Sequence, residues 1–248
     1  MKNLTLILIL LFSANIFAAG GGQHFDPAGT NIRSKDSLRN GAKYYMNYCA
    51  ACHSLQYQRY SRMAEDLGMS KDEVMDNLVF TDAKFTDHIT NTMDNDQVKE
   101  KEWFYAAYPK DLSLIAKARG VDWLSAYLKS FYKDDKRPSG WNNTVFDKAS
   151  MPHVMWELQG IQGAEFDSHE DENGIVSYEF KGFTQITEGS MSPEEFDETI
   201  RDVVNFLDYS AEPAKLIRMA YAPWVILFMV VFTFLAYLLK INYFRDIH

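Results

Sequence analysis

Two cysteines and a neighbouring histidine are the residues best placed to do chemistry. Cys49 and Cys52 are the only cysteines in the sequence, and His53 follows the second directly. This order fits the pattern C-x-x-C-H, which attaches a c-type haem. Residues three and four apart share one face of a helical turn, so both thiols can add to vinyl groups on one porphyrin edge while the imidazole reaches the iron. We therefore predict one covalently bound haem c.

Three other interpretations of this motif are less well supported. A zinc site would need further ligands at a characteristic spacing, and the remaining histidines show none: His24, His88, His153, His169 and His248. A thioredoxin-like pair would follow a strand and precede a helix, which the surrounding residues do not indicate. If the motif occurred by chance, an exported chain, as predicted below, would carry two thiols without a role in an oxidising compartment.

A haem iron needs a sixth ligand or an open face, and this choice separates electron carriers from ligand-binding haem proteins. Most methionines are explained as fillers of helix cores. Met151 differs because it follows a long polar segment and precedes Pro152, where a rigid backbone can hold a thioether. His153 and Met155 remain competitors for the same role. The methionine candidates in the body are Met46, Met63, Met69, Met75, Met93, Met151, Met155 and Met191.

The two ends of the chain predict export and membrane anchoring. Residues 1–18 combine a positive start, an apolar stretch and small residues, which is typical of a cleaved signal peptide. A first membrane helix is the alternative, but the apolar stretch is short. Residues 213–240 contain an uncharged run long enough to cross a bilayer. We expect residues 19–212 in the periplasm, one span in the inner membrane, and a cytoplasmic tail at 241–248.

Composition limits the classes of partner. The formal net charge is −9, which argues against nucleic acid, since phosphate backbones select surfaces rich in lysine and arginine. A length of 248 residues allows one full-sized domain with a small appendage.

Periodicity and capping signals predict a mainly helical body. Helices are expected over 37–54, from the capping box at Ser70 to about Val79, and from a second capping box at Ser192. Two shorter helices, 109–119 and 122–132, should break at Gly120, with Asp122 capping the second. Residues 133–150 should form a loop. Short strands are expected at 157–160 and 174–180.

Several motifs, taken in order, resemble the cytochrome c1 family, the haem subunit of cytochrome bc1 complexes. The resemblance covers the chain from about Asp36 and is closest to proteobacterial members. It departs from the family at Lys110, which stands where the family has a second proline. The matching segments are Cys49–Ser54, Pro109–Ser113, Ala118–Arg119, Arg137–Asn143, Met151–Trp156 and the C-terminal span.

The resemblance implies a cytochrome c-like haem domain with long loop insertions and a small β element, plus one C-terminal transmembrane helix. It assigns His53 and Met151 as the axial metal ligands and Arg119 as the partner of a haem propionate. Pro109 belongs to the loop expected to support His53, and we expect a carbonyl near Pro109 to accept its N–H, because ligating imidazoles have such partners.

The family role is one-electron transfer from the Rieske iron–sulfur protein to a c-type cytochrome, within a complex that also holds cytochrome b and is dimeric. The chain alone would then catalyse no bond-making reaction, being an electron-transfer subunit of quinol–cytochrome c reductase. A free-standing, membrane-anchored c-type cytochrome that shuttles electrons to a terminal oxidase is the alternative. An enzyme or gas sensor with an open iron is another.

Overall fold

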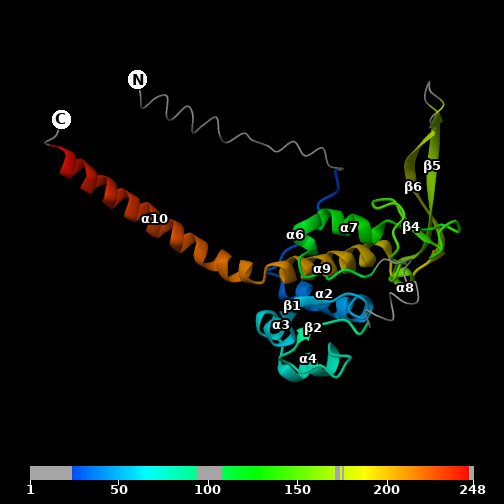
Figure 1. Ribbon diagram of the computed structural model, residues 1–248, viewed down its shortest axis with the longest axis horizontal. Coiled ribbons are helices and arrows are strands. Elements are labelled where there is room, and N and C mark those ends of the chain that lie inside the picture. Colours follow the sequence, from blue (N-terminus) through cyan, green and yellow to red (C-terminus); the bar gives the residue numbers. More distant parts are fainter. Residues whose placement is uncertain (1–23, 94–107, 171–173, 175, 246–248) are drawn as a thin grey trace.

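The structure, a computed structural model, describes residues 24–93, 108–170, 174 and 176–245. Within these residues the body is mainly helical with small two-stranded sheets, and one long helix forms the C-terminal part (Figure 1). The expected mainly α fold is therefore confirmed. The helices are α2 (Lys35–Tyr48), α3 (Tyr60–Leu67), α4 (Lys71–Asn77), α6 (Ile115–Arg119), α7 (Val121–Lys129), α8 (Trp156–Gln159), α9 (Pro193–Ala211) and α10 (Ala214–Phe244). The strands are β1 (Leu55–Arg59), β2 (His88–Ile89), β3 (Phe131–Lys133), β4 (Trp141–Asn143), β5 (Gly160–Glu170) and β6 (Val176–Glu188).

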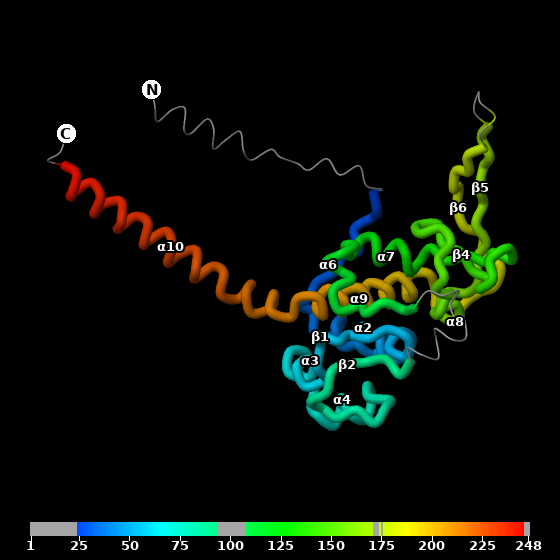
Figure 2. The backbone as a smooth tube through the Cα atoms, viewed as in Figure 1, coloured from blue at the N-terminus to red at the C-terminus, as the bar shows by residue number. Residues whose placement is uncertain are grey.

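Helix α9 is the centre of the body. It packs against α2 on one side and against α6 and α7 on another, as the tube in Figure 2 shows. Buried rings join α2 to α9: the centroids of Tyr45 and Phe206 lie 5.6 Å apart. A polar network closes the same contact, because the Asp202 carboxylate accepts hydrogen bonds from Ser37 at 2.6 Å and Asn40 at 2.7 Å. The helix that leads into the cysteine motif is therefore fixed by the core.

Gly41 lets α2 and α9 approach closely. A Cβ atom at this position would lie 2.0 Å from the Asp202 carbonyl oxygen and 2.8 Å from the Phe206 Cβ. Because the obstructing atoms include backbone, Gly41→Ala is expected to lower the free energy of unfolding by about 3 kcal/mol, the upper end of overpacking costs. Denaturant unfolding of the detergent-solubilised chain measures this. Gly182→Ala, which meets nothing within 4 Å, is the control, and equal stability of the two variants would contradict the prediction.

Both capping boxes are confirmed. The Ser70 hydroxyl accepts the Glu73 N–H at the start of α4, and the Ser192 hydroxyl accepts the Glu195 N–H at the start of α9. In each case the glutamate also accepts the N–H of the capping serine. These four-residue signals need no tertiary information, since all of their partners are local.

The first expected helix differs from its prediction at its C-terminal end. The sequence predicts a helix to residue 54, but α2 ends at Tyr48 with Cys49 as its C-cap. The Cys49 carbonyl then accepts hydrogen bonds from both Cys52 N–H and His53 N–H, which closes a turn rather than another stretch of helix.

Two further expectations around α6 and α7 are corrected. Residues 109–114 are not helical as expected, because Asp111 accepts backbone N–H groups from Ser113 and Gln56. Such side-chain bonds compete with a helix, and α6 starts only at Ile115. Gly120 does separate the two helices, with φ of 88°. Asp122 does not cap α7: its carboxylate accepts the Ala28 N–H at 2.8 Å.

The β elements are larger than expected. Residues 133–150 are not all loop, because β4 pairs antiparallel with β3. Residues 157–160 fall mostly in the short helix α8, and β5 and β6 form one long antiparallel ribbon that projects from the body (Figure 1). Most of this ribbon is exposed on both faces. It therefore lacks the alternation of buried and exposed residues that predicts a half-buried strand.

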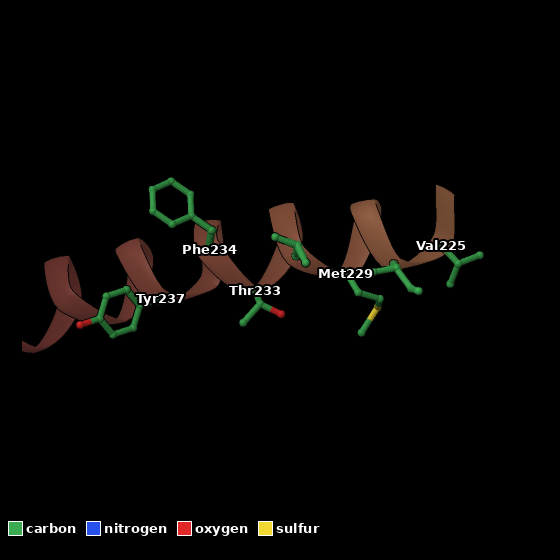
Figure 3. A pocket seen from close by; sticks show the side chains of 7 residues that line it. Val225, Met229, Thr233, Phe234 and Tyr237 are labelled. Carbon is green, nitrogen blue, oxygen red and sulfur yellow. The ribbon is translucent and has the colours of Figure 1, made fainter. Parts of the chain in front are cut away.

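The C-terminal helix α10 extends away from the body (Figure 1). Its 31-residue length and apolar composition suit a membrane span, and none of its residues is buried. An open apolar hollow, lined by Val225, Met229 and Phe234 among others (Figure 3), is formed by residues of this helix alone and includes no residue of the cysteine motif. At the junction with α9, Glu212 contacts both Lys117 and Arg218, so the carboxylate links the anchor helix to the body. The expected signal, residues 1–18, lies outside the described residues, as does the end of the expected tail.

Candidate haem site

The cysteine motif forms a compact turn at the end of α2. Cys52 N–H and His53 N–H donate to the Cys49 carbonyl at 3.0 and 2.8 Å. The buried Tyr45 hydroxyl donates to the His53 carbonyl at 2.7 Å and so ties the turn to the core. Both cysteines are free, and each residue as a whole is partly buried. The turn therefore brings two free thiols and an adjacent imidazole together within five consecutive residues.

The His53 ring is held by a backbone carbonyl. Its Nδ1 lies 2.6 Å from the carbonyl oxygen of Lys110. A carbonyl only accepts hydrogen bonds, so Nδ1 carries the proton and Nε2 keeps the lone pair that a metal requires. Burial lowers the pKa of His53, against the opposing effect of the Lys110 carbonyl, which favours the neutral ring. The expected carbonyl near Pro109 is thus present, one residue further along the chain.

The thiol environment is unlike that of a redox-active pair. Burial, with a smaller contribution from Cys52, raises the pKa of Cys49 to about 12, and burial also raises the pKa of Cys52. Thiol–disulfide enzymes depend on the opposite shift, a lowered pKa that supplies thiolate. Within the described residues, no three His, Cys, Asp or Glu side chains gather in a way that could hold a metal ion directly. The two sulfurs and the oriented imidazole instead fit a c-type haem.

The loop that begins at Pro109 fastens the chain segment after the motif. Asp111 accepts the Gln56 N–H at 2.9 Å, and the Ser113 hydroxyl accepts the Tyr57 N–H at 3.1 Å. Pro109 itself precedes the residue that contacts His53. The role of this loop is therefore to present the Lys110 carbonyl at a fixed place beside the imidazole.

Met151 differs from the methionines that lie in the core. Met46, Met63 and Met155 are buried in the core, as expected for residues that fill gaps. Met151 is only half-buried, and its sulfur accepts a hydrogen bond from the Tyr127 hydroxyl at 3.6 Å. Burial raises the pKa of Tyr127 to about 12, so its hydroxyl stays a donor. The thioether is thus held by a polar contact and not by burial in the core.

Arg119 is the last residue of α6 and lies on aromatic rings. Its guanidinium carbon is 4.9 Å from the centroid of Trp123 and 5.9 Å from that of Phe146. A planar guanidinium stacks well on such faces and still presents its N–H groups at its edge. The structure therefore gives this charge a defined position, from which it can bind a carboxylate.

Sequence reasoning missed two residues that shape this site, Tyr127 and Asn143, and it located the carbonyl beside His53 near Pro109 without naming Lys110. Lys110 acts through its carbonyl, which has no sequence signature. Tyr127 stands four residues after Trp123, a helical spacing that would have shown that these two side chains share one face of α7. Asn143 is buried, and its side-chain amide donates to the Tyr127 carbonyl at 2.8 Å. This asparagine therefore helps to hold α7 beside the segment that leads to Met151.

Comparison with known proteins agrees with this geometry. The model of the Cytochrome C1 family matches residues 30–247. The chain belongs to the cytochrome c1 family. It is 44% identical to cytochrome c1 of Allochromatium vinosum over 249 residues, which cover all of both chains. It is 24% identical to cytochrome c1 of Rhodospirillum rubrum over 277 residues, which cover 96% of each.

A relative with a different name matches equally completely. The protein named ammonia monooxygenase gamma subunit of Nitrosomonas europaea is 37% identical over 250 residues, which cover all of both chains. Membership of the cytochrome c1 family supports a c-type haem and an electron-carrier role in a bc1 complex. The haem domain with one C-terminal apolar helix is the architecture that this family membership implies.

Proposed function

We propose that Cys49 and Cys52 bind one haem c covalently and that His53 and Met151 are its axial ligands. The turn at Cys49–His53, with the His53 ring oriented by Lys110, is the observation that supports this most strongly. Arg119, stacked on Trp123, would bind a propionate. Pro109 would contribute through the loop that places the Lys110 carbonyl. When bound, a haem with His and Met ligands supplies a one-electron couple of raised potential.

In this proposal the chain is an electron-carrier subunit of quinol–cytochrome c reductase. It accepts one electron from the Rieske iron–sulfur protein and passes it to a c-type cytochrome. The residues of the chain make and break no bonds in this step: they hold the couple, set its potential and exclude water from its ligands. Cytochrome b and the Rieske protein are the partners in the membrane, and the complex is a dimer.

The topology follows from the two ends of the chain. The signal at 1–18 would be removed, residues 19–212 would fold in the periplasm, 213–240 would span the inner membrane, and 241–248 would remain in the cytoplasm. The apolar surface of α10 supports the span. The link from Glu212 to Lys117 and Arg218 would then hold the haem domain close to the bilayer surface, where quinol is oxidised.

Copurification distinguishes this proposal from the free-standing cytochrome. An affinity tag on the C-terminal tail, followed by mild detergent solubilisation, is expected to recover b-type haem, c-type haem and an iron–sulfur cluster together. A shuttle would yield c-type haem alone, and that result would overturn the proposal. The protocol must retain the full chain, because α10 is the segment that cytochrome b would contact within the bilayer.

A further inference from the structure

We infer that Tyr127 is a positioning residue for the Met151 sulfur and raises the reduction potential of the centre. The inference rests on the proposed ligation by Met151. Its basis is the hydrogen bond of 3.6 Å from the Tyr127 hydroxyl to the Met151 sulfur. No motif of the sequence analysis included Tyr127, and the proposed ligand set does not require it.

The tyrosine ring is fixed on several sides. It stacks on Trp123, with centroids 4.9 Å apart and planes 8° apart, and it forms an edge-to-face pair with Phe131, with centroids 5.1 Å apart. The Tyr127 carbonyl accepts a hydrogen bond from the side chain of Asn143, a residue that is 1% exposed. The hydroxyl therefore reaches the sulfur from a rigid position, which is the condition for a weak hydrogen bond to act consistently.

The segment that carries Met151 packs against the same aromatic group. His153 stacks on Phe131 with centroids 5.3 Å apart and planes 4° apart, and it forms an edge-to-face pair with Trp141, with centroids 5.2 Å apart. Pro152 restricts the backbone between Met151 and His153. Phe131 thus contacts both the donor tyrosine and the segment of the acceptor methionine, so the relative position of hydroxyl and sulfur is determined by one packed cluster.

The chemistry of a thioether gives this contact a consequence. Sulfur has two lone pairs, so it can accept a hydrogen bond with one and bind a metal with the other. A hydrogen bond withdraws electron density from the sulfur and weakens its donation to oxidised iron more than to reduced iron. The Tyr127 hydroxyl therefore stabilises the reduced form relative to the oxidised form.

The test is Tyr127→Phe in the full chain with its haem, because this change removes the hydroxyl and keeps the ring. Equilibrium redox titration is expected to show the one-electron equilibrium constant for reduction lowered by up to about tenfold, the effect of one hydrogen bond. For one electron, tenfold corresponds to about 59 mV. Thr199→Val is the matched control, since it removes a hydroxyl that lies 3.6 Å from a different methionine sulfur, that of Met191; its potential should equal that of the wild type.

Two further variants show whether an unexpected result contradicts the role of Tyr127 or the assignment of Met151 as a ligand. A purely packing role would leave Tyr127→Phe at the wild-type potential and shift only Tyr127→Leu, which would overturn the inference. Met151→Leu should lose the weak far-red absorption band of thioether-ligated ferric haem. If Met151→Leu loses this band and the reduction potential of Tyr127→Phe equals that of the wild type, the inference about Tyr127 is overturned and the ligand assignment stands. Retention of the band in Met151→Leu would overturn the ligand assignment and the inference with it.

Discussion

The double replacement Cys49→Ala and Cys52→Ala is expected to abolish covalent haem completely. The two thiols are the only cysteines in the sequence, so no other sulfur can form the thioether bonds of a c-type haem. Haem-dependent peroxidase staining after denaturing electrophoresis of the exported chain measures this directly, since only covalently bound haem survives denaturation.

Ala51→Ser is the matched control for the cysteine replacement. Ala51 lies between the two cysteines and is exposed, so the change alters the motif without removing a sulfur, and haem staining should remain. Staining that persists in the double alanine variant would contradict the account. Loss of staining in both variants, with normal export of the chain, would also contradict the account, because the spacing of the two cysteines and the histidine would then not be sufficient to attach haem.

Met151→Leu should have the second largest effect. Under the proposed ligation, this change removes the thioether that favours reduced iron, so the potential should fall by a substantial part of the ~0.8 V range that axial ligands span. The open coordination position should then bind carbon monoxide in the reduced protein. Redox titration and visible spectra with and without the gas provide the measurement.

Met155→Leu is the control for the ligand assignment. Met155 lies in the same segment and is 2% exposed within the core, so its replacement should leave both the potential and the resistance to carbon monoxide unchanged. If Met155→Leu opened the iron and Met151→Leu did not, the axial ligand would have to be reassigned from Met151 to Met155.

The parts of the fold that could be predicted are those whose signals are local. The capping boxes at Ser70 and Ser192, the break at Gly120 and the apolar C-terminal helix each depend on neighbouring residues. The helix α3 and the extent of the β5–β6 ribbon were missed. The ribbon is held by pairing between strands whose faces are both largely exposed, so no alternation of polarity marks it in the sequence.

For the site, residue types could be predicted more readily than contacts. The spacing of Cys49, Cys52 and His53 is enough to indicate haem, because the attachment chemistry requires that spacing. The support for the imidazole was expected from a carbonyl near Pro109 and comes from that of Lys110, the next residue. The sequence could not name the residue, since a carbonyl is available at every residue and only the path of the loop selects one. The Tyr127 contact likewise depends on how α7 meets a distant loop.

Mass spectrometry of the chain recovered from the membrane tests the central claim most directly. A proteolytic peptide that contains Cys49–His53 should carry the mass of one haem, with both cysteine sulfurs consumed in thioether bonds. Finding the same peptide with two unmodified thiols, or with a disulfide between them, in chains that were exported and folded would contradict the account.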